Sequence, residues 1–167
     1  VLVLPNNKNI IMAAELAAPM SEKKVVVIPT KTVPQGLTAM LNFDADASLE
    51  DNVALMNDCL SSVSTMQITY AARDSDFDGY QIHEGDYLGL SDGALLGTSR
   101  DITDLLTAMA DKVHEAGKEF VNIFYGSDIS AEDADAAAEI FRTHAPDTDI
   151  NVLSGGQPIY YYLISAE

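Results

Sequence analysis

"VVVIPTKTVPQGLTAM", residues 25–40, carries the clearest structural signal in this chain. Its first four residues form an apolar run without alternation, which is typical of a strand buried on both faces of a parallel sheet. A polar turn, Thr30-Lys31-Thr32, follows, and Pro34 then stands where the first turn of a helix would begin. Phosphates and carboxylates often bind where a strand leads through a polar loop into a helix N-terminus. The stretch predicts an α/β protein and leaves three interpretations of the turn open: an anion site, a docking surface, or a turn alone.

The segments around this stretch alternate between strand and helix patterns. Apolar or alternating residues predict strands at 1–4, 25–28, 66–72, 120–124, 150–153 and 159–164, and helical spacing predicts helices that begin near Asn9, Thr32, Ser48, Ile102 and Ser130. Between about Tyr70 and Gly97 the alternation predicts an inserted β-hairpin. The whole pattern predicts a layered α/β domain, with a mostly parallel sheet and helices on both faces. The strands at 1–4, 25–28 and 120–124 are expected in the buried centre of that sheet.

Length, charge and cysteine content restrict the class of protein. The 167 residues fit a single domain, and 47% of them are hydrophobic, as in globular proteins. Nine basic and 26 acidic residues give a net charge of −17, which disfavours nucleic acid and anionic membranes as partners. Cys59 is the one cysteine, so no internal disulfide can form, which suits a reducing, cytoplasmic compartment. No apolar run approaches the roughly 20 residues that span a bilayer. The chain begins at Val1, without an initiator methionine, and we expect a domain of a longer protein.

Catalytic and metal-binding motifs are absent from the sequence. It holds neither a Walker loop nor a glycine-rich dinucleotide turn, and no serine or cysteine stands in a nucleophile elbow. His83, His114 and His144 share no ligand spacing, so we interpret each as a surface or helix-end histidine. "RDSDFDG", residues 73–79, resembles a calcium loop but lacks the glutamate at the twelfth position. A polar turn in which Arg73 pairs with an aspartate is the preferred interpretation.

Gln157 and three consecutive tyrosines, residues 160–162, stand at the start of the last predicted strand. Strand alternation turns either Tyr161 or its two neighbours inward, so at least one tyrosine is expected at the surface. Exposed aromatic side chains suit protein contacts, although packing of all three at a strand edge is the alternative.

Five segments together resemble a known family: "LPNNKNIIMAAE", "VVVIPTKTVPQGLTAMLNFD", "TYAARDSDFDGYQIHEGDYLGL", "FYGSDISAEDA" and "GGQPIYYYLISAE". The chain resembles the C-terminal domain of the fatty acid kinase A subunit family, also described as dihydroxyacetone-kinase-like or Dak phosphatase-like. The resemblance covers residues 1–167 and implies a fold of the DegV and dihydroxyacetone kinase type. It also implies a bacterial parent chain with an ATP-dependent kinase domain outside this sequence. ATP and magnesium are expected on that domain, and no cofactor on this one.

The resemblance further implies a partner. In such a kinase the C-terminal domain is expected to engage a DegV-like fatty-acid-binding protein, whose bound acyl chain is phosphorylated for phospholipid synthesis. This chain would then be a non-catalytic docking domain, and homodimerisation of the parent chain is left open. One alternative is a DegV-type pocket that binds a fatty acid or small anion directly. Another is the phosphatase of the older family label, although the sequence shows no nucleophile with a supporting base.

The predicted partner- or ligand-facing residues combine two strand-end loops with later segments. In an open α/β sheet the functional crevice lies at the carboxyl ends of the strands, so we interpret the polar residues after the first two strands as one surface. They are Asn6, Asn7, Lys31, Thr32 and Gln35, and Arg73, Gln157 and Tyr160 are further candidates. Lys31 is expected to meet an acidic group on the partner, while an exposed tyrosine anchors the interface.

Overall fold

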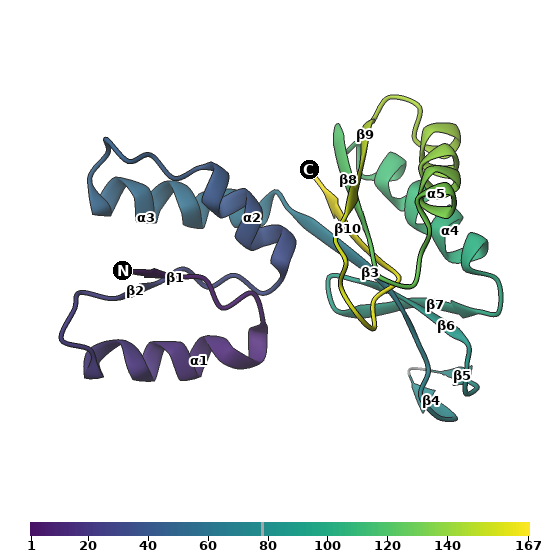
Figure 1. The fold of residues 1–167 in the computed structure, drawn as a ribbon, viewed down its shortest axis with the longest axis horizontal. Helices are drawn as coiled ribbons and strands as arrows, with labels where there is room; N and C mark the ends of the chain where they lie inside the picture. Colours follow the sequence, from purple (N-terminus) through teal and green to yellow (C-terminus); the bar gives the residue numbers. More distant parts are fainter. Residues whose placement is uncertain (78) are drawn as a thin grey trace. The chain divides into compact units, whose positions relative to one another are not determined.

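The computed structural model describes residues 1–77 and 79–167, so Asp78 of the segment 73–79 lies outside the described residues. The chain forms two compact units, Val1–Val63 and Ser64–Glu167, and each is described by itself (Figure 1). The sequence predicts one mostly parallel sheet with an inserted β-hairpin. The described strands instead fall into three sheets, of two, six and two strands.

The Val1–Val63 unit is a small parallel α/β layer. Strands β1 (Leu2–Val3) and β2 (Val26–Val27) pair in parallel, and Figure 1 shows them between α1 (Lys8–Ala17) on one side and α2 (Val33–Leu41) and α3 (Leu49–Asp58) on the other. Short 3-10 turns, η1 (Ala18–Met20) and η2 (Cys59–Ser61), follow α1 and α3. The core is small: Ile28, Ala39 and Met56 are buried, and Leu2, Leu4, Val53, Cys59 and Leu60 pack against them.

The Ser64–Glu167 unit is built on a six-stranded sheet with the order β7-β6-β3-β10-β8-β9. Its elements are β3 (Ser64–Tyr70), β6 (Tyr87–Ser91), β7 (Ala94–Ser99), α4 (Ile102–Glu115), β8 (Phe120–Tyr125), α5 (Ala131–His144), β9 (Asp149–Ser154) and β10 (Tyr162–Ala166). A separate hairpin, β4 (Ser75–Phe77) with β5 (Tyr80–Ile82), lies between β3 and β6 in sequence. The β8–β9 pair is parallel because α5 connects the two strands, and the other described pairs of this sheet are antiparallel.

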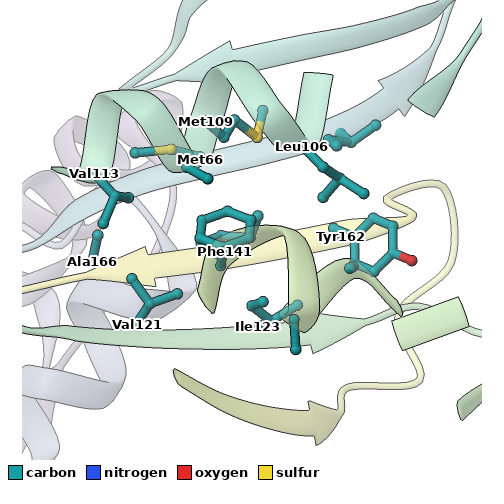
Figure 2. Close-up of a cluster of buried hydrophobic side chains, with 14 of the residues drawn as sticks. Met66, Leu106, Met109, Val113, Val121, Ile123, Phe141, Tyr162 and Ala166 are labelled. Carbon is teal, nitrogen blue, oxygen red and sulfur yellow. The ribbon is translucent and has the colours of Figure 1, made fainter. Parts of the chain in front are cut away.

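The larger core lies between this sheet and its two described helices. Alternate residues of the strands point to one face, where they meet the apolar stripes of α4 and α5. Figure 2 shows Leu106, Met109 and Val113 of α4 and Phe141 of α5 packed against Met66, Val121, Ile123, Tyr162 and Ala166 of the strands. Both helices therefore cover the same face of the sheet.

The α/β class is confirmed, while three details of the predicted sheet are wrong. The large sheet is mostly antiparallel, and the segments 1–4 and 25–28 form a sheet of their own instead of its centre. Helices flank both sides of the β1–β2 pair, but α4 and α5 share one face of the large sheet. The physical reason is that an apolar run reports burial, whereas strand direction and neighbours depend on contacts remote in sequence.

The local signals at element ends are confirmed. Thr32 caps α2, since its Oγ1 accepts the backbone N–H of Gln35 at 3.3 Å. Ser48 caps α3 by accepting the N–H of Asp51 at 3.1 Å, as a capping box requires. Gly117 follows α4 with φ +61°, the left-handed conformation expected of a C-terminal cap.

Candidate functional site

The predicted polar residues after the first two strands come together in the Val1–Val63 unit. We call Asn6, Asn7, Lys31, Thr32 and Gln35 the strand-end surface. Because β1 and β2 are parallel, their carboxyl ends and the loops that follow lie side by side. The backbone N–H of Asn6 donates to Thr30 Oγ1 at 2.9 Å, which ties the two loops together. Arg73, Gln157 and Tyr160, the other predicted residues, belong to the Ser64–Glu167 unit, which is described by itself.

Most polar groups of the strand-end surface hold its own loops in shape. The Asn7 side chain caps α1 by accepting a backbone N–H of the first turn at 2.9 Å, as Thr32 does for α2. Gln35 Oε1 accepts the N–H of Lys31 at 2.8 Å, and its Nε2 donates to a carbonyl within η2 at 3.2 Å. The Lys31 side chain is exposed. Its ammonium is thus the group of this surface best placed to reach a partner.

Asn6 lies at the tightest point of the strand-end surface. Its φ of +55° is in the left-handed region, which asparagine tolerates better than most residues. Its Oδ1 is buried and has no hydrogen-bond partner among the described residues. A Cβ on Gly36 would lie 2.1 Å from that oxygen, so the Asn6 side chain occupies the space that a larger residue at 36 would need.

We expect Gly36→Ala to lower the free energy of unfolding by about 1 kcal/mol, because the new methyl group must displace the Asn6 side chain. Asn6→Gly removes the obstructing atoms and suits the positive φ. Gly36→Ala in the Asn6→Gly background should therefore cost less than Gly36→Ala alone, which urea denaturation of all four proteins would measure as a double-mutant cycle. Equal costs in both backgrounds would contradict the contact.

A second candidate surface is the loop of residues 155–161, "GGQPIYY", in the Ser64–Glu167 unit. The Gln157 side chain points inward, where its Nε2 donates to the Phe124 carbonyl at 2.9 Å. The backbone carbonyl of Gln157 accepts the N–H of Ser127 at 3.0 Å. Gly126 leaves no room for a Cβ, which would lie 2.3 Å from the Tyr160 carbonyl oxygen. The loop is thus fixed by backbone contacts, and Gln157 acts as its internal brace.

The three consecutive tyrosines differ in exposure. Tyr162 is buried, its hydroxyl donates to the Asp133 carbonyl at 3.2 Å, and burial raises its pKa to about 12. Tyr161 is half-buried and packs edge-to-face against Tyr70 and Tyr87, at centroid distances of 6.4 and 5.3 Å. Burial raises the pKa of Tyr161 as well. Tyr160, the predicted surface tyrosine, is half-buried.

Two exposed side chains, one in this loop and one in β3, were not identified from the sequence. Ile159 is 58% exposed and Tyr70 is 45% exposed. The alternation of the last strand placed Ile159 inside it, but β10 begins only at Tyr162. Pro158 is the one local signal that the strand starts later, because proline cannot donate a hydrogen bond to a ladder.

Arg73 and the three histidines belong to the Ser64–Glu167 unit and lie outside the 155–161 loop. Arg73 is exposed, and its predicted pairing with an aspartate stays a prediction, because the segment includes Asp78. His144 pairs with Asp111 at 2.8 Å near the end of α5, and His114 lies in the last turn of α4. The exposed His83 lies 3.5 Å from the buried Asp86 carboxylate.

Asp86 connects the hairpin region to the large sheet. Its Oδ2 accepts the backbone N–H of His83 at 2.9 Å, and its Oδ1 lies 3.3 Å from Arg100 Nε. The first of these bonds, together with Arg100, keeps the pKa of this carboxyl below its usual value. The group is therefore a charged structural brace.

Residues 1–77 and 79–167 provide neither a metal centre nor a membrane span. No group of three or more histidine, cysteine, aspartate or glutamate side chains there is arranged to hold a metal ion. None of the helices in this part of the chain has the length and apolar character to cross a membrane.

The match to a known family extends over the entire sequence. A family model described as FakA-like, the C-terminal part of proteins similar to the fatty acid kinase A subunit, matches residues 1–167. The chain belongs to this family. Among the curated relatives, Protein YloV of Bacillus subtilis (strain 168) is 38% identical to this chain over 167 residues. The match covers 100% of this chain and 30% of YloV. An uncharacterized protein of Staphylococcus aureus (strain USA300) is 36% identical over 166 residues, 99% of this chain and 30% of that protein. The family resemblance expected from the sequence is confirmed.

Solved structures share the fold of this FakA-like C-terminal domain. The Streptococcus pneumoniae Fatty Acid Kinase (Fak) B3 protein, solved with linoleic acid, matches with a TM-score of 0.68 and 14% identity, over 99% of this chain and 70% of that one. The dihydroxyacetone kinase from C. freundii, solved with AMP-PNP and Mg²⁺, matches with a TM-score of 0.65 and 12% identity, over 99% of this chain and 38% of that one. The predicted DegV and dihydroxyacetone-kinase-like fold is confirmed.

Proposed function

We propose that this chain is the docking domain of a bacterial fatty acid kinase and holds a DegV-like fatty-acid-binding protein during phosphoryl transfer. The family match over residues 1–167 is the observation that carries the proposal. In the reaction a carboxylate oxygen of the acyl chain attacks the γ-phosphorus of ATP, the bond to the β-phosphate oxygen breaks, and ADP leaves. The proposal assigns ATP, magnesium and this chemistry to the remainder of a longer, cytoplasmic parent protein.

Positioning is the physical contribution of such a domain. Orienting two reactants can supply several kcal/mol of a transfer barrier without any residue touching the reacting atoms. The strand-end surface and the 155–161 loop are both suited to this role, because internal hydrogen bonds fix their shape before a partner arrives. A net charge of −17 favours a partner with a basic surface and would speed its approach.

Lys31 offers a direct test of the strand-end surface. We expect Lys31→Ala to weaken binding of an oleate-loaded DegV-family protein from the same genome by about 1–2 kcal/mol, if the ammonium pairs with a carboxylate of the partner. Isothermal titration calorimetry would measure the dissociation constant. Lys23→Ala is the matched control, since it removes the same charge from another exposed position. Equal effects of the two substitutions on the dissociation constant would show that Lys31 makes no specific contact with the partner.

The half-buried Tyr160 tests the second surface in the same assay. If it is an interface anchor, Tyr160→Ala should weaken binding by a similar 1–2 kcal/mol, roughly the cost of truncating an interface aromatic. Tyr80→Ala is the control, because Tyr80 is an exposed tyrosine of the separate β4–β5 hairpin. An unchanged dissociation constant for Tyr160→Ala would assign this tyrosine to loop packing alone.

Direct binding of a fatty acid is the second candidate function, and one cavity is a candidate binding site for it. A cavity of about 300 Å³ lies between α4, α5 and the sheet, lined by Tyr87, Leu106, Ile140 and Tyr162 among others. This volume is at the lower end of the range of ligand pockets. Native mass spectrometry of the purified chain would separate the two functions, because a bound acyl chain adds a defined mass and a docking domain carries none.

A further inference from the structure

Ile159 combines two features that each cost free energy. Its φ is +74°, a region in which β-branched residues are genuine outliers. The N–H of Tyr160 donates to the Pro158 carbonyl at 2.8 Å across it, which closes a γ-turn of the rare, strained kind. The side chain is 58% exposed, so much of its apolar surface stays in water.

Packing in the hydrophobic cores of the described residues does not offset either cost. Residue 159 is a member of neither core cluster. Glycine would adopt the same backbone conformation without strain, and a polar residue would be better solvated. Strained residues persist where the surrounding structure holds them, and they cluster at ligand clamps and binding sites. Among the described residues the hydrophobic cores therefore give no reason for an isoleucine here, which points to a binding role.

The surrounding structure holds Ile159 in one position. Its carbonyl accepts the hydroxyl of Thr69 at 3.1 Å, and the N–H of Tyr161 donates to the Ile68 carbonyl at 2.9 Å. The Gln157 brace and the close approach to Gly126 fix the other side of the loop. Because the loop is already ordered, burying Ile159 against a partner would cost little further conformational entropy.

The neighbours of Ile159 indicate the chemistry of that partner. Tyr70 is 45% exposed and packs on Tyr161 at a centroid distance of 6.4 Å, so a second exposed apolar side chain borders the loop that holds Ile159. The exposed Asp128 follows Ser127, whose N–H donates to the Gln157 carbonyl of the loop at 3.0 Å. An apolar centre with a carboxylate at its rim complements an apolar pocket edged by lysine or arginine.

We propose that Ile159 is the anchor residue of the docking interface and inserts into an apolar pocket, edged by basic side chains, on the DegV-like fatty-acid-binding protein. This inference rests on the proposed function and assigns its central contact. In this interface Tyr70 supplies a second apolar contact, and Asp128 pairs with the basic edge.

Ile159→Gly separates binding from folding. It removes the anchor while keeping a residue that suits the positive φ, so the dissociation constant for the oleate-loaded DegV-family protein of the same genome should rise about 30-fold or more. The thermal unfolding midpoint should stay the same or rise, because the strain is gone. Ile159→Leu, which keeps an apolar side chain, should bind within about threefold of the unmodified chain. Leu153→Ala, at a 45% exposed leucine of β9, is the control for losing surface area elsewhere.

Each other outcome has a defined meaning. If the unmodified chain binds and Ile159→Gly binds equally well, the anchor role is wrong while the docking function stands. If Ile159→Gly lowers the unfolding midpoint, the isoleucine serves folding and the inference is overturned. If the unmodified chain does not bind at all, the proposed function fails and the inference with it. Ile159→Gly can also leave partner binding unchanged and abolish another interaction. Loss of self-association in sedimentation velocity would make a second copy of the chain the occupant, and loss of flotation with phosphatidylglycerol vesicles would make it a membrane. Either result refutes the proposal.

Discussion

Replacing Phe141 by alanine is expected to lower the free energy of unfolding of the Ser64–Glu167 unit by about 3–5 kcal/mol. The Phe141 ring is 0% exposed and lies where α5 meets the sheet, surrounded by side chains of α4, β8 and β10 (Figure 2). Alanine would leave a cavity that such a closely packed interior can close only in part. A loss of this size is a large fraction of the stability of an ordinary domain.

Tyrosine fluorescence can follow this unit alone. All seven tyrosines of the chain lie between Tyr70 and Tyr162, and the sequence has no tryptophan. Urea denaturation read by this signal would give the free energy of unfolding of the Ser64–Glu167 unit. Phe120→Ala is the matched control, because Phe120 is the same residue type, in the same unit, but 51% exposed. Similar losses for the two variants would mean that the core is not centred on Phe141.

Gly126→Ala is expected to be the most damaging exchange in the 155–161 loop, at about 3 kcal/mol. The new Cβ would lie 2.3 Å from the Tyr160 carbonyl oxygen and 2.7 Å from that of Gln157. Both oxygen atoms belong to the backbone, so the new methyl group can be accommodated only if the backbone of the loop moves. A rotamer change of one side chain cannot relieve the clash. Partner binding should fall together with stability, because the same movement displaces Ile159.

Gly97→Ala is the control for the Gly126 exchange. The added Cβ at position 97 would lie 3.6 Å from Leu105 Cδ2, an ordinary contact distance. Urea denaturation of both variants gives the comparison. If Gly126→Ala unfolds at the same urea concentration as Gly97→Ala, the loop has room to relax and is less rigid than its hydrogen bonds indicate.

Local structure could be predicted from the sequence wherever the deciding interaction is itself local. The caps by Thr32 and Ser48 and the glycine after α4 depend on residues three or four positions apart, and each is observed. The polar loops after β1 and β2 could also be paired, because parallel strands bring their carboxyl ends together. In the strand-end surface, however, sequence alone did not show that the Gln35 side chain bonds the backbone of its own loop and of η2.

Strand order and the positive φ of Ile159 could not be predicted, for the same physical reason. The partners of β10 are β3 and β8, and both are chosen by packing against α4 and α5 instead of by any nearby residue. The γ-turn at Ile159 opposes the propensity of a β-branched residue, so only the bonds from Thr69 and Tyr161 impose it. An exposed binding residue held against its propensity leaves little trace in a single sequence.

The central place of β10 bears on how this unit is made by the ribosome. Residues 162–166 are synthesised last among the strands of the large sheet, yet they pair with β3 on one side and β8 on the other. Until they emerge, the inner edges of both strands present unpaired N–H and C=O groups, which are templates for pairing with other chains. The pairs β3–β6–β7 and β8–β9 can form earlier, but the sheet can be completed only when β10 has been made. This interval is when a chaperone would protect the growing protein most.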